Sequence, residues 1–457
     1  MHDQIKSRAR RQIPAVTKVL DALSYYDLPR PMIVNVVRRE LSQIRAKSEV
    51  PEFELIVSLV RRSLNELRAS RLQPIINGTG IVIHTNFGRA PLAPDAIRAL
   101  GEASSGYSNL EYDLATGERG RRGAYIENAL ALLCGAETAA VVNNCAAALV
   151  LIVHHFTRLK PEVVISRGEM VQIGGGFRIG EIIEATGAKL REIGATNKTT
   201  ISDYSRAIGR DTAIIFKVHR SNFFMSGFVR SPSTAEIAGI ARKKRTPFVE
   251  DLGSGAIVET EQFGIVEHEP TPSEALKDGA DLVCFSGDKL FGGPQAGIIA
   301  GKRRFVAALK REPLFRALRC DKLCLAALQA TVDLHLNQSA AGIPAIALLQ
   351  VSEDELRIRA EAIVKRLEGV PAQITIGHSV VKVGGGTLPK STISSVTVDI
   401  VPRNCSLADL AVRLRNSRPP VIGHIANDRF KLDLRTIFPQ QDDLVVDAIR
   451  TACSQRL

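Results

Sequence analysis

The sequence has no apolar run long enough to cross a membrane, because its longest, residues 146–153, is far shorter than the roughly 20 residues that a spanning helix needs. Residues 1–6 lack the apolar block of a secretory signal. No Cys-X-X-Cys pair occurs among the seven cysteines, and an odd number of scattered cysteines favours reduced thiols inside a cell. These absences predict a cytoplasmic protein without membrane association.

Metal-ligand spacing is missing as well. The nine histidines show no pairing typical of a metal site, and the adjacent His154 and His155 would point to different faces of a helix. We therefore expect no bound metal.

The chain does have size and positive charge. Its 457 residues can bury a large core and should form two or three domains. A hydrophobic content of 45% and a charged content of 24% are typical of a soluble globular protein. The net charge of +12 favours a polyanionic partner, although solubility alone is an equally good explanation of the charge.

The first domain is predicted over residues 1–70. Apolar residues recur there at helical spacing, as at Ile33, Val37 and Leu41. The segment has 13 Lys and Arg against eight Asp and Glu, so it holds +5 of the net charge. It is predicted to be a basic helical domain that binds tRNA or another partner, or that forms an oligomer.

Two further domains are predicted. Over residues 71–330 short apolar strands alternate with helical stretches, which indicates βαβ units and a mostly parallel sheet. Residues 331–457 are helix-rich at first and then contain longer strands, so a small α+β domain is expected. The strands are expected at 139–143, 163–166, 213–218, 247–250, 282–285 and 296–300, and in the last domain at 374–383, 394–400 and 429–434.

One lysine stands in a glycine-rich stretch, residues 286–297, directly after the strand predicted at 282–285. An amine presented at a strand end with little bulk around it suits a lysine that forms a Schiff base with a carbonyl. Lys289 is therefore the candidate catalytic residue, although a lysine in a tight glycine turn can also be simply solvated.

An aspartate ends another predicted strand. Asp251 is followed by Leu252 and then by a Gly-Ser-Gly turn. Ligand-binding residues of parallel sheets lie at such carboxyl ends, and a carboxylate there can keep a pyridinium nitrogen protonated, so that the ring accepts electrons. An aspartate that only caps a loop is the alternative.

A third element is a predicted phosphate-binding turn at Asn143, Asn144, Cys145 and Ala146, where a strand runs into a helix of small residues. Backbone N–H groups at a helix start bind anions, and small side chains let a phosphate approach, although Asn is also an ordinary helix cap. The order of phosphate turn, strand-end aspartate and lysine predicts pyridoxal phosphate as the cofactor, in an enzyme of the aspartate aminotransferase fold. His219, after the strand at 213–218, either lines the cofactor pocket or is an ordinary loop histidine.

Several motifs resemble those of bacterial selenocysteine synthases, the L-seryl-tRNA(Sec) selenium transferases. They are residues 77–92, with His84-Thr85-Asn86-Phe87-Gly88-Arg89; 109–113 and 117–120; 166–169; and 286–297. The resemblance covers nearly the whole chain, including the basic amino-terminal segment and Gly384-Gly385-Gly386. It implies a fold type I pyridoxal phosphate enzyme: α/β with a mostly parallel sheet, an amino-terminal helical domain and a small α+β domain.

The resemblance also implies a reaction. Serine esterified to tRNA(Sec) would lose its hydroxyl and gain selenium from selenophosphate. Lys289 would hold the cofactor and, once freed, take the Cα proton, which requires a neutral amine. Asp251 would face the pyridinium, and Asp288 would supply a proton to the leaving hydroxyl.

The same resemblance implies the binding partners. Arg89, Arg316 and Arg319 would bind selenophosphate. Because Arg316 and Arg319 are three residues apart, they are expected on one face of a helix. The alternative is that this face is basic only because it is exposed to solvent. The family forms large homo-oligomeric rings, such as decamers, with active sites between subunits. Seryl-tRNA(Sec) is the expected macromolecular substrate.

Two alternatives stay open. One is a pyridoxal phosphate lyase or aminotransferase that acts on a small phosphorylated or amino-acid substrate without tRNA. The other is a tRNA-binding protein whose cofactor chemistry has lapsed, which the presence of Lys289 and Asp251 argues against.

Overall fold

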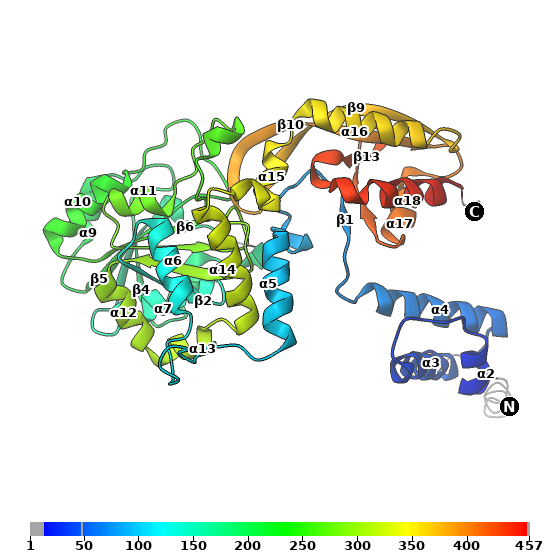
Figure 1. The fold of residues 1–457 in the computed structure, drawn as a ribbon, viewed down its shortest axis with the longest axis horizontal. Coiled ribbons are helices and arrows are strands. Elements are labelled where there is room, and N and C mark those ends of the chain that lie inside the picture. The colour runs from blue at the N-terminus through cyan, green and yellow to red at the C-terminus, as the bar shows by residue number, and fades with distance from the viewer. Residues whose placement is uncertain (1–12, 47–48, 173, 455–457) are drawn as a thin grey trace. The chain divides into compact units, whose positions relative to one another are not determined.

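The computed structural model describes residues 13–46, 49–172 and 174–454 (Figure 1). The chain divides into two compact units, Met1–Pro74 and Ile75–Leu457. Among the described residues no helix is both long enough and apolar enough to span a bilayer.

The amino-terminal unit is a small helical domain. Its helices are α2 (Val16–Asp21), α3 (Arg30–Arg45) and α4 (Phe53–Ala69). The apolar residues with helical spacing form its core: Val37 and Leu41 of α3 pack with Val60 and Leu64 of α4, and all four are almost fully buried. Because these apolar positions face inward, most arginines of the two helices lie on the surface.

The larger unit is built on a seven-stranded sheet of order β2-β8-β7-β6-β5-β3-β4. All neighbouring strands are parallel except β8, which is antiparallel to both β2 and β7. The mostly parallel sheet predicted from the sequence is therefore confirmed. The strands are β2 (Thr138–Val142), β3 (Glu162–Ser166), β4 (Lys189–Ile193), β5 (Thr212–Val218), β6 (Phe248–Gly253), β7 (Leu282–Ser286) and β8 (Gly297–Gly301).

Strand β4 was not predicted from the sequence. It lies at the edge of the sheet, and its residues Lys189 to Glu192 are at least partly exposed, so it lacks the continuous apolar run that marks the inner strands.

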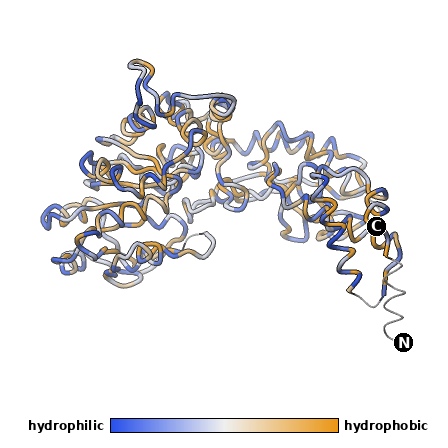
Figure 2. Tube along the Cα trace, turned by 90° about the horizontal axis from the view of Figure 1, so that it is seen from below, coloured by the Kyte–Doolittle hydropathy of each residue, from blue (hydrophilic) through white to orange (hydrophobic). Residues whose placement is uncertain are grey.

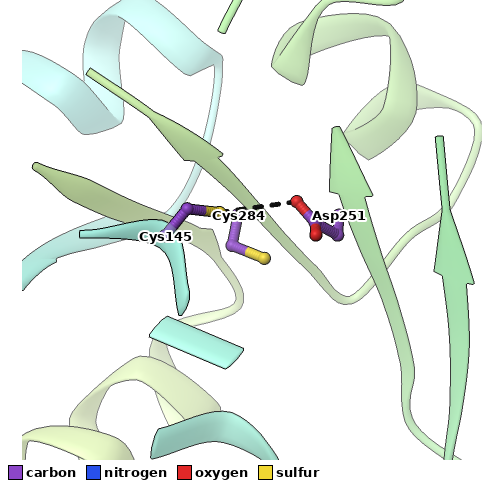
Figure 3. Close-up of side chains that lie close together, drawn as sticks. All are labelled: Cys145, Asp251 and Cys284. Carbon is purple, nitrogen blue, oxygen red and sulfur yellow. Dashed lines mark hydrogen bonds between the residues drawn. The ribbon is translucent and has the colours of Figure 1, made fainter. Parts of the chain in front are cut away.

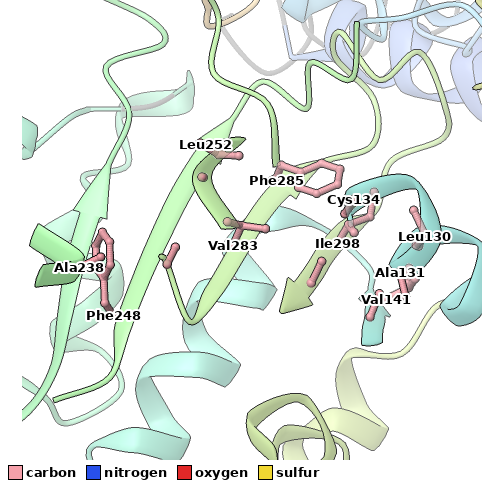
Figure 4. Packing of buried hydrophobic residues seen from close by; sticks show 14 of the residues in the cluster. Leu130, Ala131, Cys134, Val141, Ala238, Phe248, Leu252, Val283, Phe285 and Ile298 are labelled. Carbon is pink, nitrogen blue, oxygen red and sulfur yellow. The ribbon is translucent and has the colours of Figure 1, made fainter. Parts of the chain in front are cut away.

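Helices cover both faces of this sheet. One core joins the sheet to α6 (Ala124–Cys134), α9 (Ile201–Ala207), α10 (Thr234–Lys244), α11 (Pro272–Lys277) and α14 (Lys322–Leu336). Figure 4 shows part of this core, where Leu130 and Cys134 of α6 lie beside Val141 and Ile298 of the strands. The other core joins the opposite face to α7 (Cys145–Phe156), α8 (Ile179–Glu184) and α12 (Arg303–Arg311). Most helices carry both apolar and polar residues along their length, as helices that cover a sheet should (Figure 2).

The last part of the chain forms a four-stranded antiparallel sheet of order β12-β13-β10-β9. These strands are β9 (Ala372–Gly384), β10 (Thr387–Pro402), β12 (His424–Ala426) and β13 (Arg429–Asp433), and they pack with α16 (Glu353–Arg366), α17 (Leu407–Arg415) and α18 (Asp442–Ser454). The short strand β1 (Ile76–Asn77) pairs in parallel with β11 (Val421–Ile422), so the chain enters the larger unit beside its carboxyl-terminal part.

The boundary expected at residue 330 falls inside helix α14. Leu328 and Val332 of this helix lie in the same core as the seven-stranded sheet, so the helix belongs with that sheet. The remaining helices of the larger unit are α5 (Pro94–Ser105), α13 (Pro313–Leu318) and α15 (Pro344–Gln350).

Candidate active site

Lys289 lies in the tight loop that follows β7. The loop folds back so closely that a Cβ on Gly287 would lie 2.7 Å from the carbonyl oxygen of Pro294. The lysine is half-buried, and its Nζ faces two glycines: a Cβ on Gly253 would lie 3.8 Å from Nζ, and a Cβ on Gly386 would lie 3.4 Å from it. Backbone without side chains therefore leaves room around the amine.

Gly386 reaches the lysine from the carboxyl-terminal sheet, as the last residue of the Gly384–Gly386 turn between β9 and β10. All three glycines have positive φ angles, of +86°, +58° and +80°. A Cβ on Gly385 would lie 2.5 Å from the carbonyl oxygen of Ile83, so no larger residue fits there. Sequence reasoning noted this turn as a motif but did not assign it to the lysine, because the contact joins residues 97 positions apart.

Asp251 lies near the carboxyl end of β6 and is buried. Its Oδ1 accepts hydrogen bonds from the backbone N–H of Gly253 at 3.0 Å and from the thiol of Cys145 at 3.5 Å (Figure 3). Burial raises the pKa of Asp251, and the nearby Lys289 charge is the largest effect that opposes the rise.

Two thiols accompany this carboxylate. The ligand atoms of Cys145, Asp251 and Cys284 all lie within 4.8 Å of one another (Figure 3). The hydrogen bond with Cys145, followed by burial, raises the pKa of Cys284 well above its ordinary value. Thiols and carboxylates are possible metal ligands, and the prediction of no metal rested on histidine spacing alone, so it did not consider this set.

The predicted phosphate turn joins β2 to α7. Asn144 caps the helix, since its Oδ1 accepts the N–H of Ala147 at 2.8 Å. The N–H groups of Cys145 and Ala146 have no acceptor among the described residues, as expected for the first turn of a helix. Gly297 passes so close that a Cβ there would lie 2.1 Å from the carbonyl oxygen of Asn144.

Asn143 and His219 lie at the same end of the sheet. The backbone N–H of Asn143 donates to the carbonyl oxygen of Leu318 at 2.8 Å, and that of His219 donates to the carbonyl oxygen of Asp251 at 2.8 Å. The His219 side chain has a partner that the sequence did not reveal, because its Nε2 lies 3.2 Å from Oε1 of the buried Glu269.

Arg89 lies beside the lysine loop. Its guanidinium donates to both carboxylate oxygens of Asp288, at 3.0 and 2.8 Å. The backbone supports this placement, since the N–H of Ala90 donates to the carbonyl oxygen of Asp288 at 3.2 Å and Arg89 itself has a φ angle of +65°. The structure thus joins two of the predicted site residues in one ion pair next to Lys289.

Arg316 and Arg319 do not share a helical face as expected. Helix α13 ends at Leu318, and Arg319 is already extended, with φ −69° and ψ 146°. Both arginines nevertheless line one cavity of about 540 Å³, together with Arg121, Arg122, Lys310 and Arg311. Arg89 is not among the described residues that line it.

A carboxylate organises the arginines at this cavity. Glu111 lies 2.8 Å from Arg119, 3.1 Å from Arg122 and 3.3 Å from Arg319. The hydrogen bond from Arg122 is the main reason why the pKa of Glu111 is lowered. The sequence did not indicate that Arg119 and Arg122 share a carboxylate partner with Arg319.

Comparison with known proteins places the chain in a family. The family described as "SelA: L-seryl-tRNA selenium transferase" matches residues 75–438. The L-seryl-tRNA(Sec) selenium transferase of Carboxydothermus hydrogenoformans is 42% identical over 446 residues, which cover 95% of each chain. That of Geobacter sulfurreducens is 40% identical over 459 residues, 97% of this chain and 99% of the relative.

A solved structure supports the fold. The structure of a D-glucosaminate-6-phosphate ammonia-lyase has a TM-score of 0.58, covers 84% of this chain and 96% of that chain, and is 20% identical in sequence. This likeness confirms the predicted fold class. By the family match and by its nearly full-length relatives the chain belongs to the L-seryl-tRNA selenium transferase family, which confirms the enzyme class and the pyridoxal phosphate cofactor that its motifs implied.

Proposed function

We propose that this chain converts seryl-tRNA(Sec) to selenocysteinyl-tRNA(Sec) by eliminating the serine hydroxyl and adding selenium from selenophosphate. The observation that carries the proposal is the meeting of Lys289, Asp251 and the start of α7 at one end of the sheet, in a chain of this family. Pyridoxal phosphate bound there supplies an acceptor for the electrons of the Cα–H bond.

The residues present fit this cofactor. The free N–H groups at the start of α7 suit its phosphate, and Gly297 lets the strand pass close to that turn. Asp251 offers a carboxylate oxygen to the ring nitrogen, while Cys145 and Gly253 hold the other oxygen. The two glycines beside the Lys289 amine leave space for the carbon that it must bond.

Lys289 and Asp288 are assigned the proton transfers of the reaction. We assign removal of the serine Cα proton to the Lys289 amine. Both carboxylate oxygens of Asp288 accept hydrogen bonds from the Arg89 guanidinium. Asp288 would therefore serve the leaving hydroxyl only after Arg89 turns from it toward the selenophosphate anion.

Arg316 and Arg319 are assigned to selenophosphate with Arg89, because the cavity that they line is rich in arginine. Leu318, which stands between them in the sequence, accepts the backbone N–H of Asn143 in the phosphate turn. The same cavity favours one alternative. Its volume of about 540 Å³ would also admit a small phosphorylated substrate, and the enzyme would then act without tRNA.

The amino-terminal unit is proposed to bind the tRNA, since its core residues turn inward and leave exposed arginines such as Arg38, Arg45 and Arg62 on its surface. A cytoplasmic homo-oligomeric ring with active sites between subunits is proposed from the resemblance. The seven cysteines are all free thiols, which suits a reducing compartment.

The test is a conversion assay with purified protein, selenophosphate and labelled serine esterified to selenocysteine tRNA. After hydrolysis of the ester the released amino acid should be selenocysteine. Serine on an ordinary serine tRNA is the control and should stay unchanged. Turnover of a free phosphorylated substrate, with no conversion on either tRNA, would support the alternative.

A further inference from the structure

The net charge of the larger unit is concentrated in one stretch of sequence. Residues 75–457 carry a net charge of +6, and residues 302–322 alone contain eight Lys and Arg against two acidic residues, also a net charge of +6. This stretch forms α12, α13 and the start of α14 and is called the α12–α13 basic surface below. We propose that the α12–α13 basic surface binds the sugar-phosphate backbone of the substrate RNA as its aminoacylated end enters the active site, an inference that rests on the proposed function.

The surface is hollowed in two places that share one residue. Besides the cavity lined by Arg316 and Arg319, a second cavity of about 710 Å³ is lined by Arg303, Arg304 and Arg311, with Glu137, Lys302 and Ala307. Arg311 lines both cavities. Selenophosphate is far smaller than the first cavity and fills only part of it. A nucleic acid strand presents a row of phosphates that can contact Arg311 and the arginines of the second cavity.

Part of the charge on this surface is available to a ligand. Lys302 pairs with Asp281, and Lys310 pairs with Glu127. By contrast, Arg304, Arg311 and Arg316 are exposed and have no carboxylate partner among the described residues. The guanidinium of Arg304 lies 4.4 Å from the centre of the Phe305 ring, which holds it in place without neutralising it.

The surface leads to the reacting end of the sheet. Strand β8 runs antiparallel to β7, so α12 begins at the amino ends of the parallel strands. The chain then returns through α13, whose last residue, Leu318, accepts the backbone N–H of Asn143 in the phosphate turn. A polyanion that follows this surface is therefore guided toward the Lys289 end, where the ester at the RNA terminus must react.

A second basic run provides a matched control. Arg242, Lys243, Lys244 and Arg245 lie at the end of α10 and are all exposed. Helix α10 packs on the opposite face of the sheet from α12. The four basic residues precede the amino end of β6, whereas Asp251 lies near the carboxyl end of that strand. These residues carry the same kind of charge without a path to the active site.

The experiment measures binding of transcribed selenocysteine tRNA to the full-length, cofactor-loaded protein over a series of salt concentrations. The double variant Arg304→Gln/Arg311→Gln should bind more weakly, and the slope of log K against log salt should fall by about two, roughly one for each phosphate that is no longer neutralised. The control Lys243→Gln/Lys244→Gln should match the unchanged protein. The visible absorbance of the bound cofactor verifies that each variant is folded.

Each other outcome is informative. Unchanged affinity and slope in the Arg304/Arg311 variant, with normal binding by the unchanged protein, would overturn the inference and leave the proposed function standing. Equal losses in both double variants would mean that charge acts diffusely, which also overturns it. No binding by the unchanged protein would overturn the inference and the proposed function together.

Discussion

Replacing Gly386 with alanine tests whether the glycine turn serves to keep space beside the Lys289 amine. An alanine at φ +80° costs about 1–2 kcal/mol of backbone strain. Its methyl group would lie 3.4 Å from Nζ, in ordinary contact with the amine but in space that the carbon bonded to that amine must share. We expect the dissociation constant for pyridoxal phosphate to rise at least about tenfold, or ~1.4 kcal/mol.

Gly369→Ala separates this effect from backbone strain. Gly369 has nearly the same φ angle, +82°, and a Cβ there would meet no atom within 4 Å. Both variants should therefore lose similar stability in thermal unfolding of the cofactor-free protein, while only Gly386→Ala should bind the cofactor more weakly in an absorbance titration. Equal cofactor affinity in the two variants would refute the idea that the turn keeps this space open.

Three further substitutions test other parts of the account. Burial raises the pKa of Glu169 to about 7. Its ionised form therefore destabilises the fold above pH 7, and this penalty disappears as the pH falls toward 4.5. Glu169→Gln should add up to about 3 kcal/mol to the unfolding free energy at pH 8 and little at pH 4.5. Cys145→Ala removes a donor to Asp251 and should weaken cofactor binding about two- to tenfold, whereas Cys145→Ser keeps a donor and should bind normally. Arg89→Ala should slow selenocysteine formation about ten- to a hundredfold with the cofactor absorbance unchanged, because its guanidinium contacts Asp288.

Each of these has a result that would count against it. A stability gain of Glu169→Gln that does not change with pH would mean that the carboxylate is not the destabilising group. Identical cofactor affinity of the Ala and Ser variants at Cys145 would mean that the thiol does not help to orient the Asp251 carboxylate. Loss of cofactor absorbance in Arg89→Ala would make that arginine a structural residue.

The sequence predicted those parts of the fold in which a local pattern carries the information. The inner strands are continuous apolar runs, and β2, β5, β6, β7 and β8 were confirmed within a few residues of their expected bounds. The order of the phosphate turn, Asp251 and Lys289 likewise follows the chain, since each stands at or shortly after the carboxyl end of a strand, at the same end of the sheet.

Contacts between distant residues could not be predicted in this way. Nothing near Gly386 in the sequence indicates that it faces Lys289, and nothing near His219 indicates Glu269. The helical periodicity that put Arg316 and Arg319 on one face failed because the helix ends at Leu318, one residue too early. The two arginines still line one cavity, because folding of the loop rather than helix geometry brings them together.

The most direct test of the central claim is to locate the cofactor. Protein loaded with pyridoxal phosphate is treated with borohydride, digested and analysed by mass spectrometry. We expect the phosphopyridoxyl mass on Lys289 alone and none on the Lys289→Ala variant. The same mass on a different lysine, with Lys289 unmodified, would contradict the active site described above.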